Sequence, residues 1–229
     1  MANRDGLGIL VVDDDPDILD LLKYNFEKEG FRVKTLEKSY KAVAVAKDFK
    51  PDLIILDIMM PSPNGMDICA ELRKTKEFEK TYIFFLTARS ETYYQHAALN
   101  TGGDDYIEKV VGLRALISKV TSVLKKRFVI RKGMSQFEIG NIRIDREMQS
   151  VSVFNREVKL NRGEFELLFF FAQNADKIIS TETILNAIWG SQIYFFDSSI
   201  ELYIESLRTK ISPDIIQSFH NHHYKFTAH

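Results

Sequence analysis

The chain has 229 residues, of which 45% are hydrophobic and 28% are charged, and its formal net charge is −1. This composition is typical of a globular protein, which excludes a disordered or fibrous chain, and the length allows one large or two ordinary domains. The longest apolar run, 167–172, is far shorter than the roughly 20 residues of a membrane span, so we expect no membrane contact. Without a recognisable secretion signal we expect a cytoplasmic protein. The single cysteine, Cys69, excludes an internal disulfide and a cysteine-rich metal site.

The first 126 residues alternate short apolar runs with helical patterns. The predicted strands are 8–12, 31–35, 53–56, 82–87 and 105–107, and helices are predicted to begin near residues 17, 39, 66, 91 and 112. Most of these strands are continuously apolar, which is typical of a parallel sheet buried on both faces by crossover helices. Five strand–helix units predict an α/β doubly wound five-stranded parallel sheet, with the domain spanning residues 1–126.

A basic, glycine-containing stretch, 127–136, is predicted to link this domain to a second one at 137–229. Segments 137–144 and 150–159 are predicted to be short strands. Helices are predicted at 165–173, at 182–188 and from Ser198, and the first and third follow the capping-box patterns Asn161 with Glu164 and Ser198 with Glu201. Pro213 ends the third helix, and 215–219 with 223–226 predict a terminal hairpin. Three helices followed by a two-stranded wing indicate an α+β winged helix-turn-helix domain.

Polar side chains gather at the carboxyl ends of four predicted strands. Asp13 and Asp14 follow the first strand, Asp57 the third, Thr87 ends the fourth, and Lys109 comes just after the fifth. The carboxyl ends of strands in an open α/β sheet form the ligand crevice, so we expect these residues to meet. Three carboxylates raise one another's pKa values unless a positive charge compensates, and Mg²⁺ suits carboxylates, waters and a phosphate. We therefore predict a Mg²⁺ site where Asp57 can attack a phosphoryl group. Any single acidic residue at a strand end can instead be only a helix cap, as we expect for Asp15.

Four sequence runs carry a resemblance to a known family. They are 11–16 (Val-Val-Asp-Asp-Asp-Pro), 56–61 with Gly65, 86–88 (Leu-Thr-Ala) and 103–109, and they resemble the signature of receiver domains in two-component response regulators, over residues 7–126. The resemblance implies a CheY-like fold with strand order 2-1-3-4-5, in which a sensor histidine kinase phosphorylates Asp57. It implies Mg²⁺ ligation by Asp14, Asp57 and the Met59 carbonyl, with Asp13 assisting through water. It also implies that Thr87 and Tyr106 form a switch pair and that Lys109 stabilises the phosphoryl group. On its residues alone, Tyr106 reads as an ordinary half-buried strand aromatic.

One departure from the family concerns the residue that follows Lys109. The family usually has a proline there, joined by a cis bond, whereas this chain has Val110. A cis bond before a residue other than proline costs about 3–4 kcal/mol. We therefore predict a trans Lys109–Val110 bond, a looser loop and altered phosphorylation kinetics.

Residues 137–229 resemble the winged-helix output domain of the OmpR/PhoB family. The likeness rests on fold-bearing positions such as 164–168, 184–185, 189–190 and 224–226, whereas the wing, 220–224, lacks the family's arginine and both glycines. The remaining candidates for DNA contacts are Tyr203, Ser206, Arg208, Lys210, Ser218, His220 and Asn221.

The charge of this second part is acidic. Residues 135–229 contain nine basic and twelve acidic residues, a net −3, and Glu205 is predicted to face the DNA groove. Since phosphate contacts supply most non-specific affinity, we expect weak or atypical binding to duplex DNA. His220, His222 and His223 read either as a metal cluster or, more simply, as solvated wing residues. The loop 193–196 can touch RNA polymerase in the family, although four apolar residues in a row favour a core role.

We interpret the chain as a phosphorylation-dependent DNA-binding transcriptional regulator. It is not an enzyme in the usual sense, although it would catalyse phosphoryl transfer to Asp57 and the hydrolysis of the product. The resemblance implies a homodimer on phosphorylation, with Asp105, Lys119 and Lys126 as candidates for its interface. The alternative is a receiver-controlled protein-interaction module whose winged helix has lost most DNA affinity. A phosphatase or nucleotide-binding enzyme is disfavoured, because Met59 stands where a second acid is needed and no glycine-rich turn follows the first strand.

Overall fold

The structure is a computed structural model, and it describes residues 6–87, 97–109, 113–126, 136–189, 199–220 and 222–227. The chain divides into two compact units, residues 1–127 and 128–229. The predicted linker, 127–136, lies outside the described residues except for Gln136, and so does the predicted start of a helix near residue 91.

The first unit is built on a five-stranded parallel sheet. Its strands are β1 (Gly8–Val12), β2 (Arg32–Leu36), β3 (Leu53–Asp57), β4 (Tyr82–Thr87) and β5 (Asp105–Glu108). Their order is β2-β1-β3-β4-β5, which confirms the predicted doubly wound topology. Strands β1, β3 and β4 are buried along their whole length, which explains why their sequences are continuously apolar rather than alternating.

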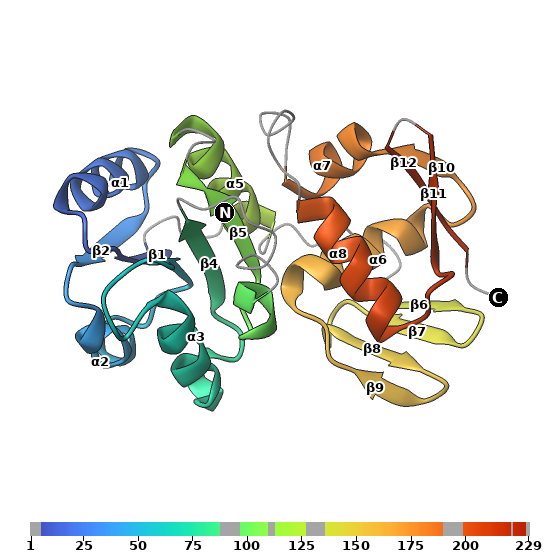
Figure 1. The fold of residues 1–229 in the computed structure, drawn as a ribbon, viewed down its shortest axis with the longest axis horizontal. Helices are drawn as coiled ribbons and strands as arrows, with labels where there is room; N and C mark the ends of the chain where they lie inside the picture. The colour runs from blue at the N-terminus through green and yellow to red at the C-terminus, as the bar shows by residue number, and fades with distance from the viewer. Residues whose placement is uncertain are drawn as a thin grey trace. The chain divides into compact units, whose positions relative to one another are not determined.

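Helices cover both faces of this sheet. The helices α1 (Pro16–Lys28) and α5 (Leu113–Lys126) lie on one face, while α2 (Ala42–Phe49) and α3 (Gly65–Arg73) lie on the other (Figure 1). Two short 3₁₀ turns, Ser39–Lys41 and Lys76–Phe78, precede α2 and β4. The Asp15 side chain accepts hydrogen bonds from the first backbone amides of α1, so its predicted role as a helix cap is confirmed.

The second unit begins with a four-stranded antiparallel sheet in sequence order. Its strands are β6 (Gln136–Ile139), β7 (Ile142–Asp145), β8 (Ser150–Val153) and β9 (Arg156–Val158). Each of the two predicted strands therefore contains a hairpin. The turn between β8 and β9 places Phe154 and Asn155 at positive φ, 50° and 62°. A phenylalanine rarely adopts this conformation and gives no turn signal, which is why the sequence pattern missed the break.

Three helices and a wing complete the second unit. The helices are α6 (Arg162–Gln173), α7 (Thr181–Trp189) and α8 (Ser199–Lys210), and α6 packs against both others (Figure 1). The wing strands β11 (Ile216–Phe219) and β12 (His223–Phe226) pair with a short strand that was not predicted, β10 (Ile178–Ser180), in the order β10-β12-β11. The winged helix-turn-helix architecture is confirmed. The capping box of Asn161 and Glu164 is present in both directions, while Ser198 lies outside the described residues.

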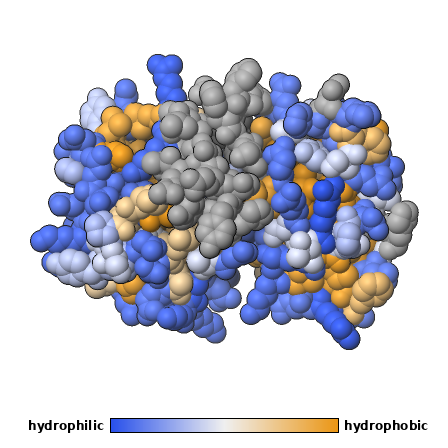
Figure 2. Space-filling view, viewed as in Figure 1, coloured by the Kyte–Doolittle hydropathy of each residue, from blue (hydrophilic) through white to orange (hydrophobic). Residues whose placement is uncertain are grey.

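The visible surface formed by the described residues is mostly hydrophilic (Figure 2). The most exposed large apolar side chains, Tyr24, Tyr40, Met148 and Phe154, belong to four separate segments. No described helix is both long and apolar enough to cross a bilayer.

A buried ion pair joins β5 to α5. Lys119 Nζ lies 3.0 Å from Asp105 Oδ1, and both side chains are fully buried. The same carboxylate accepts a hydrogen bond from Tyr82 Oη, and Lys119 also donates to the Tyr106 carbonyl oxygen. The sequence analysis placed Asp105 and Lys119 on a dimer surface. That placement is corrected here, because Lys119 lies on the inner side of α5 beside Leu116 and Val120 and is not exposed to a second subunit. The side chain of Lys126 lies outside the described residues.

We expect Lys119→Met to destabilise the first unit by about 3–5 kcal/mol, because it leaves the Asp105 carboxylate buried without its counter-charge. Lys23→Met, which removes an exposed lysine of α1, should change stability by less than about 0.5 kcal/mol. Urea unfolding of the full chain, followed by far-UV circular dichroism, measures both variants. Equal effects of the two substitutions would contradict the buried pair.

Candidate functional site

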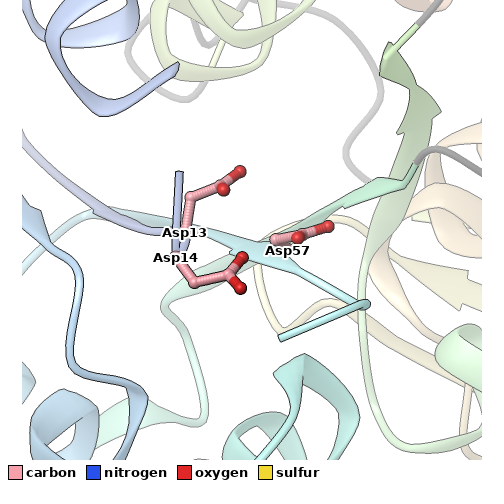
Figure 3. Close-up of side chains that lie close together, drawn as sticks. All are labelled: Asp13, Asp14 and Asp57. Carbon is pink, nitrogen blue, oxygen red and sulfur yellow. The ribbon is translucent and has the colours of Figure 1, made fainter. Parts of the chain in front are cut away.

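Three carboxylates meet at the carboxyl edge of the parallel sheet. Asp13 and Asp14 directly follow β1, Asp57 ends the neighbouring strand β3, and one oxygen from each lies within 4.8 Å of the others. The three side chains lie beside one another, with the Asp14 carboxylate directed toward Asp57 (Figure 3). Asp13 and Asp57 are buried, while Asp14 is exposed. The predicted convergence of the three residues is confirmed.

Lys109 supplies a positive charge to this cluster. Its Nζ lies 2.8 Å from Asp13 Oδ2 and 3.3 Å from Asp57 Oδ2. Burial alone would lower the pKa of Lys109, but the hydrogen bond to Asp13 and the charges of the two carboxylates outweigh it and raise the pKa. Lys109 is therefore held as an ammonium group against the cluster.

Asp57 is the member of the cluster with an unsatisfied oxygen. Burial, together with the charge of Asp13, raises the pKa of Asp57 although Lys109 opposes the shift. Asp57 Oδ1 is buried and has no hydrogen-bond partner among the described residues. A buried carboxylate oxygen is costly when unpaired, and three carboxylates with one cation leave a net negative charge. The donor set therefore fits a hard divalent cation such as Mg²⁺.

The remaining predicted receiver residues follow β3 or lie on β4 and β5, the next two strands of the sheet. The backbone of Met59 opposes the rise in the pKa of Asp57, and the Met59 side chain is exposed. Thr87 is fully buried at the end of β4, one residue beyond the partner of Asp57 in the sheet register. Tyr106 is buried on β5, opposite Phe85. Val110 and its bond to Lys109 lie outside the described residues, so the prediction of a trans bond stays a prediction.

Gly65 was noted in the sequence only as part of the receiver signature, and the structure shows its role at this site. It is the first residue of α3, and a Cβ added to it would clash with the carbonyl oxygen of Asp57. Only glycine allows α3 to begin this close to the backbone of β3. The signal in the sequence was the short spacing between Asp57 and Gly65.

In the second unit, the predicted DNA contacts of α8 have partners within the domain, although only Tyr203 is buried and Lys210 remains exposed. Tyr203 is fully buried and packs against Gly163. Ser206 Oγ and Lys210 Nζ both donate to the buried carboxylate of Glu164, the latter at 2.7 Å from each oxygen. Arg208 donates to the Ile216 carbonyl oxygen and, at 2.8 Å, to Ser218 Oγ. These residues hold α8 against α6 and the wing.

The outward face of α8 carries different side chains. Glu205 and Thr209 are exposed and Glu201 is half-exposed, so the prediction that Glu205 points outward is confirmed. The expectation that Tyr203 faces DNA is corrected by its burial.

The structure describes most of the predicted wing residues but not the loop before α8. His220 and Ser218 are exposed in the wing. Among the described residues, the cluster of Asp13, Asp14 and Asp57 is the only group of three with ligand atoms this close, so the wing histidines form no metal cluster there. Asn221 and the loop 193–196 lie outside the described residues.

Comparison with known proteins identifies both units. A family model described as response regulator receiver domain matches residues 9–121, and one described as transcriptional regulatory protein, C terminal, matches residues 155–226. The phosphate regulon transcriptional regulatory protein PhoB of Rhizobium meliloti is 34% identical over 92% of this chain and 94% of its own length. The response regulator ArlR of Staphylococcus aureus is 32% identical over 90% of each chain. The chain belongs to the OmpR/PhoB family of response regulators.

A solved structure of a family member supports this assignment. DrrB of Thermotoga maritima, an OmpR/PhoB homologue, is 26% identical and has a TM-score of 0.52, covering 97% of this chain and 99% of its own. The protein therefore combines a receiver domain with a DNA-binding output domain, the organisation of a transcriptional response regulator.

We expect Glu164→Ala to destabilise the output domain by about 2–4 kcal/mol, because it removes the Glu164 side of the capping box and the three hydrogen bonds from Ser206 and Lys210. Glu157→Ala, at an exposed position of β9, should have an effect below about 0.5 kcal/mol. Urea unfolding followed by the fluorescence of Trp189, the only tryptophan in the chain, reports on this domain. A Glu164→Ala variant as stable as Glu157→Ala would show that the inward-facing network contributes nothing to the fold.

Proposed function

We propose that Asp57 accepts a phosphoryl group from a sensor histidine kinase and that this modification controls transcription through the winged-helix output domain. The observation that supports it best is the buried Asp57 carboxylate, which has one oxygen facing Lys109 and the other without a partner among the described residues. In the transfer, an Asp57 oxygen forms a bond to phosphorus while the bond from phosphorus to the donor nitrogen breaks. Hydrolysis by water then restores the carboxylate.

Asp13, Asp14 and Asp57, with the Met59 carbonyl, are the residues that would hold Mg²⁺. The cation would neutralise charge on the phosphoryl oxygens. Lys109 would do the same, and its contacts with both Asp13 and Asp57 support this role. Thr87 would donate a hydrogen bond to the new phosphate, and Tyr106 would adjust beside it as the second member of the switch pair.

Phosphorylation would then favour a homodimer of receivers. Because Asp105 and Lys119 pair within one chain, such a dimer must use other residues of the β5–α5 face. Pairing two output domains on adjacent half-sites would add avidity to an individually weak contact with DNA. A contact with RNA polymerase through the loop 193–196 is part of the same proposal.

A second function is favoured by one specific observation. The two basic residues of α8, Arg208 and Lys210, donate to acceptors within the output domain, while Glu201 and Glu205 face outward. An acidic outward face would suit a protein-interaction module that the receiver controls, because phosphate groups of DNA repel carboxylates.

Phosphorylation is tested with radiolabelled acetyl phosphate and Mg²⁺. We expect the wild-type chain to take up label and Asp57→Ala to fall to background, because the acceptor oxygen is lost. Asp20→Ala, at an exposed position of α1, is the matched control and should label like the wild type. Removing the cation with EDTA should also reduce uptake. Equal labelling of Asp57→Ala would place the modification elsewhere and refute the proposal.

DNA binding is tested by measuring the affinity of the phosphorylated chain for duplex DNA at about 50 and 200 mM salt. We expect non-specific Kd values at the weak end of the usual range, on the order of 10⁻⁴ M at the higher salt, with clear tightening at the lower. Asp57→Ala serves as the control that cannot be phosphorylated. Absence of binding even at low salt would favour the protein-interaction module.

A further inference from the structure

One methionine of the receiver is exposed beside the carboxylate cluster. Met59 follows the end of β3 by two residues, and 45% of its surface is exposed. Its backbone opposes the rise that burial causes in the pKa of Asp57, so the two residues are neighbours at this edge of the sheet. Solvent and small solutes therefore reach the Met59 side chain close to the place where the phosphoryl group would be held.

The other sulfur atoms in the described part of the receiver are less accessible. Met60 is only 5% exposed, and Met66 is half-buried. The Cys69 thiol is buried, and burial raises its pKa to about 11, so the reactive thiolate is scarce. Because susceptibility to oxidation follows exposure, Met59 is the sulfur of this described region that a peroxide meets first.

Oxidation changes the chemical character of a methionine side chain. The sulfur lone pair attacks one peroxide oxygen, the O–O bond breaks and the other oxygen leaves as water, so the sulfur is oxidised to a sulfoxide while the peroxide is reduced. The product is polar and chiral where the thioether was apolar. We propose that Met59 is an oxidation site at which hydrogen peroxide shortens the lifetime of the phosphoryl group on Asp57. This inference rests on the proposed phosphorylation of Asp57 and adds a chemical signal that regulates it.

The effect on lifetime follows from how water reaches the phosphorylated carboxylate. In hydrolysis a water oxygen forms a bond to phosphorus, and the bond from phosphorus to the Asp57 oxygen breaks. A thioether sulfur is a weak hydrogen-bond acceptor, whereas a sulfoxide oxygen accepts hydrogen bonds and can hold a water molecule at the edge of the site. Oxidation of Met59 should therefore accelerate hydrolysis.

Peptide mapping by mass spectrometry locates the oxidation. The full chain is treated with hydrogen peroxide, and we expect sulfoxide at Met59 and at Met148, which is 76% exposed in the output domain, well before Met60. Oxidation of Met148 shows that the peroxide dose was sufficient. A chain oxidised at Met148 but not at Met59 would overturn the inference.

The lifetime of the phosphoryl group is measured on the same samples. Each chain is labelled with radiolabelled acetyl phosphate and Mg²⁺, the donor is removed, and the loss of label is compared with that of the same chain without peroxide. The oxidised wild type should lose label roughly 3- to 10-fold faster. Met148→Leu, the matched control, should show the same acceleration, whereas Met59→Leu, which keeps the volume but lacks the sulfur, should show none. Methionine sulfoxide reductases should restore the slower rate in the wild type.

Two further results would refute the inference while phosphorylation itself stands. One is an oxidised wild type that loses label no faster than the untreated chain, and the other is a Met59→Leu chain that responds to peroxide as strongly as the wild type. If the untreated wild type takes up no label, the proposed phosphorylation fails and the regulation fails with it. Far-UV circular dichroism of each treated chain checks that it remains folded.

Discussion

The receiver depends on keeping three carboxylates close together at one edge of a sheet. Asp13, Asp14 and Asp57 repel one another, and two of them are buried, where water screens the repulsion poorly. Lys109 compensates only part of this charge, because a single ammonium faces three carboxylates. A net negative charge remains, and one Asp57 oxygen has no hydrogen-bond partner in the described part of the chain, which suits a hard cation. The parallel topology creates this situation, since it brings the carboxyl ends of β1 and β3 side by side.

The same sheet connects the acidic edge to α5. Asp57 pairs in register with Leu86, one residue before Thr87, and Tyr106 on β5 lies opposite Phe85. The Tyr106 carbonyl oxygen accepts a hydrogen bond from Lys119, whose ammonium is also held by Asp105. Any movement of Tyr106 that follows a change at Thr87 must therefore be accommodated by a buried ion pair. Such a pair tolerates displacement poorly, because separating its charges in the interior is unfavourable.

Much of the fold could be predicted because the physical signal was local. Continuous apolar runs marked the buried parallel strands, and the Asn161–Glu164 pattern marked the start of α6. The hairpin turn at Phe154 could not be predicted, since nothing in that residue type indicates a positive φ. The internal hydrogen bonds of α8 were missed for a different reason. The direction of Glu205 was predicted correctly, but the bonds of Ser206 and Lys210 were not, because their acceptor Glu164 is distant in sequence.

Two buried carboxylates in this protein illustrate how a structural role differs from a functional one. Glu164 is as buried as Asp57, but its oxygens accept hydrogen bonds from the Asn161 amide, from Ser206 and from Lys210. A carboxylate with this many donors needs no further ligand, and it stabilises the fold. Asp57 has an oxygen without a partner among the described residues, and burial raises its pKa. A ligand at that oxygen would therefore supply an interaction that the described residues do not provide. The satisfaction of Glu164 also has a consequence for DNA recognition. Because it engages Lys210 and Ser206, part of the polar surface of α8 is used inside the output domain.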